Sequence, residues 1–497
     1  VTNHRTDRWG GTAANRMRFP LEIVRRVRER VGLDFILVYR LSMLDLVPGG
    51  STLNEVIELA KAVEAAGATI INTGIGWHEA RVPTIATSVP RAAFTWVTHR
   101  LMESVTVPLV TSNRINTPDV AERVLAQGHA DMVSMARPFL ADPDFLAKAR
   151  SGRAETINTC IGCNQACLDH TFSGGVTSCL VNPRVGRETE LVLAPVRRRK
   201  RLAVVGAGAA GLAFSVAAAE RGHHVTLFEA GEAIGGQLDI ARRIPGKEEF
   251  GETLRYFRVQ LKAKGVDVRL GTRATVADLT DGSFDEVVLA TGITPRTPDI
   301  PGVDRPEVVS YLDVLRDGVP VGQRVAIIGA GGIGFDVAGF LTDPGDQASL
   351  RADVYFAHWG VDTQYRSGGG LQEPAHPVAP RMVHLLQRKT TKVGAGLGTT
   401  TGWIHRTELR RRGVTMVAGA AYERIDDEGL HVTVDGEARV IPVDTVVLCT
   451  GQDSNRRLLE ELREAGQDAH VIGGAEIAVE LDAKRAIRRG TELAAAI

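Results

Sequence analysis

The sequence predicts an α/β protein built from parallel sheets, and two observations support this prediction. Apolar runs alternate with helical stretches over the first 150 residues, and a strand followed by a Gly-x-Gly-x-x-Gly turn occurs twice further along. Strand–helix alternation is typical of parallel sheets covered by helices. At 497 residues the chain is long enough for about three domains.

The first region consists of four strand–helix units. We expect strands at 35–39, 69–73, 107–111 and 132–135, and helices that include 53–66 and 119–127. Four units are half of the eight that a closed (β/α)8 barrel requires, and a small open α/β sheet is the alternative.

Polar side chains follow these predicted strands, at the end of the sheet where barrel enzymes build their active sites. They are Arg40, His78, Arg114 and Arg137. A histidine at this place can donate a proton or hydrogen bond to a carbonyl that gains negative charge, although a structural histidine fits the position equally well. The arginines could neutralise a flavin's N1–O2 region or its phosphate.

Composition and charge exclude several classes. Lys+Arg and Asp+Glu both number 59, so there is no overall basic field for nucleic acid or acidic membranes. The basic run 197–201 is interpreted as a solvated linker, with a nucleic-acid patch as the alternative. No apolar run approaches the roughly 18 residues of a membrane span, and the first residues lack a signal-peptide pattern. We expect a cytoplasmic protein, because clustered thiols in a long chain with few other cysteines fit a reducing compartment.

The two glycine turns predict two dinucleotide-binding folds. Each follows an apolar strand and opens a helix, whose free N–H groups favour a pyrophosphate. The glycines are Gly206, Gly208 and Gly211 in the first turn, and Gly329, Gly331 and Gly334 in the second. A later apolar strand ending in x-Thr-Gly is also repeated, at 287–292 and 446–451. A turn without a ligand is the alternative.

The residues beyond each turn distinguish the two ligands. Glu229 comes 23 residues after Gly206 and suits a pair of ribose hydroxyls, and Gly235-Gly-Gln237 adds a second close backbone approach, as in FAD proteins. In the second copy an insertion (343–380) comes first, and Arg388 and Lys389 then occupy the ribose-reading position. Positive charge there favours a 2′-phosphate, hence NADP over NAD, with a surface basic pair as the alternative.

Four of the five cysteines fall within 20 residues, at Cys160, Cys163, Cys167 and Cys179. Three ligands within eight residues and a distant fourth favour a [4Fe–4S] cluster, although the spacing is not among the commonest patterns. A zinc site and unliganded thiols are the alternatives. We expect Cys449 to be a core residue.

Several segments together resemble the bacterial NADPH-dependent 2,4-dienoyl-CoA reductase family, iron–sulfur flavoproteins related to trimethylamine dehydrogenase and enoate reductases. The segments are 39–45, 72–81, 134–138, 158–167, 311–315 and 400–405. The resemblance covers essentially the whole chain. It implies the C-terminal half of an FMN-type (β/α)8 barrel followed by two Rossmann-like domains.

The resemblance also implies domain limits and a function. The expected domains are the half barrel at 1–155, a cluster loop and linker at 156–196, an FAD domain at 197–320 and 440–497, and an NADP domain at 321–439. The implied activity is reduction of 2,4-dienoyl-CoA thioesters to enoyl-CoA in unsaturated fatty-acid β-oxidation. Electrons would pass from NADPH through FAD and the [4Fe–4S] cluster to FMN. A CoA thioester is then the expected small-molecule partner, with no nucleic acid and no membrane.

Residue roles follow by the same resemblance. FMN would be contacted by Arg40, Arg114, Ile115, Asn116, Ala136 and Arg137, and the thioester end of the substrate by His78, Glu79, Ala80 and Arg81. FAD would be contacted by Gly211, Glu229, Gln237 and Trp403, and the NADPH phosphate by Arg388 and Lys389. His78 is the expected catalytic residue, hydrogen-bonding the charge that develops on the thioester oxygen.

The segment 3–11 resembles the family's stretch after barrel strand four. We therefore expect the first four strands, the catalytic tyrosine and part of the FMN site to be missing from this chain. The alternatives are an enoate reductase or amine dehydrogenase on the same scaffold, an electron-transfer module, and an inactive fragment.

Overall fold

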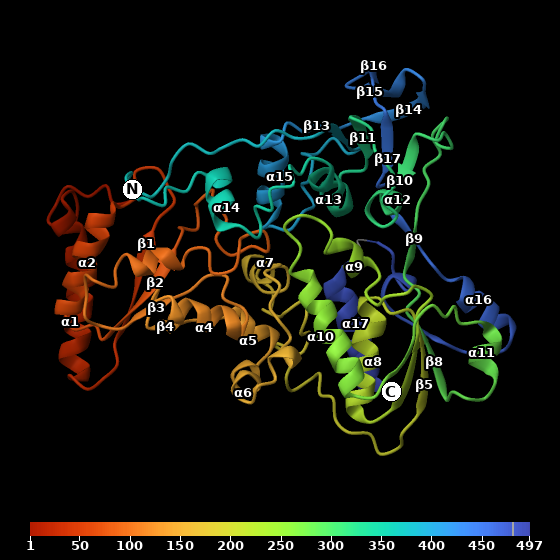
Figure 1. Ribbon diagram of the computed structural model, residues 1–497, viewed down its shortest axis with the longest axis horizontal. Helices are drawn as coiled ribbons and strands as arrows, with labels where there is room; N and C mark the ends of the chain where they lie inside the picture. Colours follow the sequence, from red (N-terminus) through yellow and green to blue (C-terminus); the bar gives the residue numbers. More distant parts are fainter. Residues whose placement is uncertain (480–481) are drawn as a thin grey trace. The chain divides into compact units, whose positions relative to one another are not determined.

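The computed structural model describes residues 1–479 and 482–497 (Figure 1). The chain divides into two compact units. The first unit contains residues 1–138 together with 346–376, and the second contains 139–345 and 377–497. Segment 346–376 therefore leaves its neighbours in sequence and joins the first unit. The expected domain limits stay a prediction.

The first unit contains a parallel four-stranded sheet whose strand order follows the chain. Its strands are β1 (Val38–Leu44), β2 (Ile70–Ile75), β3 (Leu109–Thr111) and β4 (Met132–Val133). Its helices are α1 (Ala13–Val31), α2 (Leu53–Ala65), α3 (Thr95–His99), α4 (Pro118–Ala126) and α14 (Ala352–Trp359). A sequential order without reversal is that of a barrel wall, which agrees with the predicted barrel-type region.

Local sequence determines where α2 begins and which face it buries. Glu55 N donates to the Thr52 hydroxyl at 3.3 Å, and Thr52 N donates to the Glu55 carboxylate at 3.0 Å, which is a capping box. Val56, Ala60 and Val63 are buried at helical spacing. The helix therefore begins at a fixed residue and packs its apolar stripe beside β1.

The structure corrects the first predicted strand. The expected strand 35–39 was displaced, because the parallel register with β2 begins only at Val38. Phe35 and Ile36 precede β1 and are 58% and 66% exposed. The prediction that Arg40 follows the strand was also wrong, since this exposed residue lies within β1.

The second unit contains two five-stranded parallel sheets, in the orders β19-β8-β5-β6-β7 and β10-β17-β11-β12-β13. The strands of the first sheet are β5 (Arg201–Val205), β6 (His224–Phe228), β7 (Asp267–Arg269), β8 (Glu286–Leu289) and β19 (His470–Val471). Those of the second are β10 (Val308–Ser310), β11 (Arg324–Ile328), β12 (Met382–Leu386), β13 (Thr415–Val417) and β17 (Thr445–Leu448). In both sheets the strand order reverses beside the first strand of the fold, at the switch point where dinucleotides bind. The two predicted Rossmann-like folds are confirmed.

Two small antiparallel sheets complete the second unit. One consists of β14 (Ala421–Asp426), β15 (Gly429–Val434) and β16 (Glu437–Ile441), and the other of β9 (Ile293–Pro295) and β18 (Gln452–Ser454). Because β9 and β18 directly follow the two x-Thr-Gly segments, the internal repeat ends in a pair of strands that bond to each other.

The second unit also contains helices and two 3₁₀ turns. They are α6 (Phe145–Arg150), α7 (Leu168–Phe172), α8 (Ala209–Arg221), α9 (Gln237–Ala241), α10 (Phe250–Ala263), α11 (Val276–Thr280), α12 (Tyr311–Leu315), α13 (Gly332–Leu341), α15 (Gly402–Arg411), α16 (Arg457–Glu464) and α17 (Ala483–Ala496), with 3₁₀ turns η1 (Ala154–Thr156) and η2 (Gly473–Ala475). The short α5 (Arg137–Ala141) connects the units in sequence.

The α8 helix is the centre of the first nucleotide-binding fold. It is apolar on all sides and its residues 210–218 are buried, which fits a helix enclosed by other elements. The α17 helix packs along it (Figure 1), and this close approach requires Gly490, whose Cβ would lie 2.3 Å from the carbonyl oxygen of Ala210. No helix in the described part of the chain is both long and apolar enough to cross a membrane.

Candidate functional site

The two glycine-rich turns share one backbone geometry. The first glycine of each has a positive φ, +106° at Gly206 and +110° at Gly329. A Cβ at the third glycine, Gly211 or Gly334, would lie 2.0 or 1.9 Å from the carbonyl oxygen of the first. Since L residues with side chains fit neither position, glycine is required there for the tight turn and the close helix packing.

The middle glycine of each turn faces open space. A Cβ at Gly208 or Gly331 would meet no atom within 4 Å, and these residues directly precede α8 and α13. The unobstructed approach to two helix N-termini fits a pyrophosphate at each turn.

Glu229 directly follows β6 and fixes the loops around the first turn. Its carboxylate accepts hydrogen bonds from Ala207 N and Gly231 N, both at 2.8 Å. Each oxygen keeps a further lone pair, so the carboxylate can still accept from ribose hydroxyls. Gln237 begins α9 beyond Gly236, and its Oε1 accepts from the Tyr311 hydroxyl at 3.2 Å.

The corresponding position of the second fold is occupied by Gln387. The strands β5 and β6 pair up to Phe228, and β11 and β12 pair up to Leu386, so the residues that follow are equivalent. The Gln387 amide donates to the carbonyl oxygens of Lys389 and Thr391 at 2.9 and 2.6 Å. A neutral residue thus replaces the acid and braces the loop that carries exposed Arg388 and Lys389. Sequence reasoning missed Gln387, which the strand register identifies.

An ion pair near the second glycine turn connects α13 to the segment before α10. Lys247 Nζ lies 2.6 Å from each carboxylate oxygen of Asp336 on α13. Burial, followed by the Lys247 charge, lowers the pKa of His405 to about 4, so this α15 histidine is neutral at pH 7. Trp403, expected to contact FAD, lies half-buried on the same helix.

The four clustered cysteines lie half-buried, and three of them pack against the main core of the second unit. Burial and the neighbouring Cys179 raise the pKa of Cys163 well above its ordinary value, and burial with Cys160 raises that of Cys179 to about 12. Thiols with such pKa values become thiolates when a metal supplies positive charge. The other three clustered cysteines all contribute to the shift at Cys163, so the four thiols lie near enough to influence one another.

In the first unit, the segment after β2 projects the expected substrate residues. His78, Glu79 and Arg81 are exposed, whereas Ala80 is buried and its N–H donates to the Trp77 carbonyl at 3.1 Å. This turn therefore presents three polar side chains at the end of a parallel strand, where barrel active sites lie.

Two of the expected FMN arginines approach one segment, 85–89. Arg114 is 5% exposed and its Nε donates to the Val89 carbonyl at 2.9 Å, while Arg137 Nη2 donates to the Ile85 carbonyl at 2.8 Å. Arg114 and the preceding Asn113 have φ of +55° and +74°, a conformation that costs energy and concentrates at functional sites.

The remaining residues expected at FMN are distributed differently. Ile115 and Asn116 are buried beside Arg114, Ala136 is exposed, and Arg40 donates from β1 to the Asn72 side chain. The predicted FMN contacts stay predictions, as do the other residue roles.

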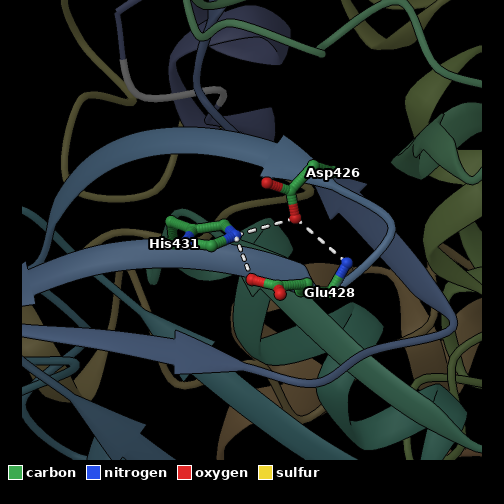
Figure 2. Close-up of side chains that lie close together, drawn as sticks. All are labelled: Asp426, Glu428 and His431. Carbon is green, nitrogen blue, oxygen red and sulfur yellow. Dashed lines mark hydrogen bonds and ion pairs between the residues drawn. The ribbon is translucent and has the colours of Figure 1, made fainter.

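A further group of close side chains lies on the β14–β15 hairpin (Figure 2). His431 Nε2 lies 2.7 Å from Asp426 Oδ1, which also accepts from Glu428 N at 3.0 Å. The hydrogen bonds from His431 and Arg424 lower the pKa of Asp426 to about 2. These contacts close the turn between the two strands, and we assign them a structural role.

Fold and turns together define an oxidoreductase that carries domains for flavin and pyridine nucleotides. Residues 1–156 match the NADH:flavin oxidoreductase / NADH oxidase family, and residues 200–477 match the pyridine nucleotide-disulphide oxidoreductase family. The chain belongs to this group of two-part flavin oxidoreductases.

Relatives share nearly the whole chain. A metal reductase of Desulforamulus reducens is 37% identical over 96% of this chain and 71% of its own length. A cinnamate reductase of Clostridium sporogenes is 29% identical over 95% of this chain and 68% of its own length. Among solved structures, a complex of 2-naphthoyl-CoA reductase with 2-naphthoyl-CoA aligns with a TM-score of 0.89 and 30% identity, covering 100% of this chain and 70% of that one.

Proposed function

We propose that the protein reduces 2,4-dienoyl-CoA thioesters with NADPH, using FAD, a [4Fe–4S] cluster and FMN. The observation that carries the proposal is the turn after β2, which presents His78, Glu79 and Arg81 at the carboxyl end of the sheet. The structural likeness to a 2-naphthoyl-CoA reductase supports a conjugated CoA thioester as the substrate.

The choice of NADPH rests on the second nucleotide fold. Gln387 cannot repel a 2′-phosphate as Glu229 would in the first fold, and the next two residues, Arg388 and Lys389, are exposed cations. Charge-assisted hydrogen bonds from such side chains stabilise phosphates.

The spacing of the cysteines in the sequence supports an iron–sulfur cube over a zinc site. Three ligands within eight residues and a distant fourth suit a compact cube, whereas a structural zinc site usually shows two separated Cys-x-x-Cys hairpins.

When bound, the flavins and the cluster supply hydride and single-electron transfer. The substrate's δ carbon would receive a hydride and its α carbon a proton, with negative charge passing through the thioester oxygen. His78 would donate a hydrogen bond to that oxygen as its charge develops. Arg81, from the same turn, would bind near the thioester end and orient the acyl chain.

The proposal is tested by anaerobic NADPH oxidation with 2,4-hexadienoyl-CoA, with free 2,4-hexadienoate and with cinnamate. We expect turnover with the thioester and a much lower rate with the free acids. His78→Gln should lower kcat with the thioester, while NADPH oxidation with ferricyanide stays unchanged. Equal turnover of the thioester and the free acids would contradict the proposal.

A reductase of free enoates is the second candidate, because a cinnamate reductase is similar over 95% of this chain. The same panel of acceptors separates the two functions. Preference for cinnamate would assign this function instead.

A further inference from the structure

Segment 346–376, here called the strap, packs into the first unit although it is inserted between α13 and β12 of the second nucleotide fold. Its aromatic residues form the contact. Tyr355, Phe356, Trp359 and Tyr365 are 1%, 6%, 4% and 5% exposed. The Phe356 ring meets Phe94 edge-on, with centroids 5.2 Å apart. The sequence shows only an insertion (343–380) with several prolines and glycines, whereas the structure shows that its aromatic residues are buried.

One side of the strap holds the loop after β1. The Tyr365 hydroxyl donates to the carbonyl oxygens of Met43 and Ser51, both at 3.1 Å. Gly369 N donates to Ser51 O at 2.8 Å, and Leu46 N donates to Gly369 O at 2.9 Å. A Cβ on Gly369 would lie 2.1 Å from a backbone oxygen of this loop, so glycine permits the approach.

This loop carries the buried carboxylate of Asp45, which is 2% exposed. Its Oδ1 accepts from Trp77 Nε1 at 2.7 Å and from the Ser42 hydroxyl at 2.8 Å, and its Oδ2 accepts from Ser51 N at 2.7 Å. Trp77 N also donates to the Asp45 carbonyl at 3.0 Å. Asp45 therefore fixes both the indole and the backbone of the residue directly before His78.

The other side of the strap holds the far end of the same turn. The Tyr355 hydroxyl donates to the Pro83 carbonyl at 2.5 Å, two residues after Arg81. Between these anchor points the side chains of His78, Glu79 and Arg81 are exposed. The strap thus forms hydrogen bonds on both sides of the 77–81 turn, while the polar side chains in the middle of the turn remain exposed.

We propose that Tyr365 and Tyr355 are positioning residues that hold the 77–81 turn, Tyr365 through Asp45 and Trp77, and Tyr355 through Pro83. The inference rests on the proposed function in that this turn binds the thioester end of the substrate. It assigns the insertion of the nucleotide-binding fold a role in the substrate site of the other unit.

The first test measures amide hydrogen exchange and needs no activity. Tyr365→Phe removes only the hydroxyl, so we expect amides of 76–84 to exchange about fivefold to tenfold faster, the scale of one or two lost hydrogen bonds. Tyr422→Phe is the matched control, because the Tyr422 hydroxyl has no hydrogen-bond partner among the described residues. Unchanged exchange at 76–84 in both Tyr365→Phe and Tyr355→Phe would overturn the proposal.

The second test is a double-mutant cycle in thioester reduction. We expect Tyr365→Phe to lower kcat for 2,4-hexadienoyl-CoA about fivefold without changing the rate with ferricyanide. In a Trp77→Phe background, where the indole bond to Asp45 is gone, Tyr365→Phe should add little. Additive effects would show that Tyr365 acts by another route and contradict the proposal.

The two tests separate the proposals. If the wild-type protein reduced no CoA thioester, the proposed function would fail, while the exchange experiment would still decide the positioning role.

Discussion

The two units differ in how well the first strand of each sheet is enclosed by its neighbours. In the second unit, the central strands β5 and β11 are flanked on both sides, and four of five residues are buried in each. In the first unit, β1 lies at the edge of its sheet, with Val38 53% exposed and Ile36 just before it 66% exposed. An apolar edge of this kind is a place where further chain can pair.

This difference shows what short motifs can and cannot specify. The nucleotide turns follow from residues within one strand–turn–helix, so their geometry repeats at Gly206 and Gly329 with φ values of +106° and +110°. The turn at 77–81, which we propose binds the substrate, has its proposed positioning residue Tyr365 almost three hundred residues from Trp77 in sequence. Local sequence therefore determines the nucleotide folds, whereas contacts between distant segments surround the 77–81 turn.

The largest expected effect is at the cysteine cluster, which we propose acts as a relay that passes electrons from FAD to FMN. Cys163→Ser should abolish thioester reduction to background while NADPH-driven ferricyanide reduction persists, because the thiolate is a proposed cluster ligand. Cys449→Ala is the control, since this cysteine packs in a separate core. Iron content and both rates check the prediction, and persistence of thioester reduction in an iron-free Cys163 variant would refute the relay.

The nucleotide turn offers the next test. Gly334→Ala places a methyl group 1.9 Å from the Gly329 carbonyl oxygen, and we expect NADPH affinity to fall by about tenfold or more. Gly339→Ala, on the same helix, meets nothing within 4 Å and should keep affinity while gaining up to about 1 kcal/mol of stability. Nucleotide titration measures the NADPH affinity of each variant, and thermal unfolding measures its stability. Equal NADPH affinities of Gly334→Ala and Gly339→Ala would contradict the assignment of this turn to the nucleotide.

Coenzyme selectivity is expected to change less. Replacing both Arg388 and Lys389 by Ala should raise KM for NADPH about tenfold and leave KM for NADH nearly unchanged, because two charge-assisted contacts to the 2′-phosphate are lost. Arg439→Ala removes an exposed arginine on β16 as the control. A parallel rise for both coenzymes would mean that the pair does not read the phosphate.

The last prediction concerns a pH dependence of stability, not of the reaction. The folded-state pKa of His405, about 4, lies below its ordinary value of 6.5, so the unfolded chain binds more protons between these values. The contribution of neutral His405 to the free energy of unfolding is therefore fully present above pH 6.5. It decreases as the pH falls toward 4, by at most about 3 kcal/mol. His405→Gln should flatten this part of the Tm profile, with His4→Gln as the control, and an unchanged profile would exclude His405 as its source.

Much of the fold could be predicted from the sequence, because alternating strands and repeated glycine turns are local signals. The start of β1 could not, since the apolar run at 35–39 matches a strand although pairing with β2 selects later residues. Gln387 became visible only through strand register. The strap was hidden because its tyrosines donate to backbone carbonyls, which leave no sequence motif.

The most direct test of the proposed function follows both reactants in one anaerobic sample. NADPH and 2,4-hexadienoyl-CoA are mixed with the protein, their disappearance is monitored, and the product is identified by mass spectrometry. We expect the two to be consumed one to one and the thioester to gain two hydrogen atoms. NADPH consumption without a reduced thioester would contradict it.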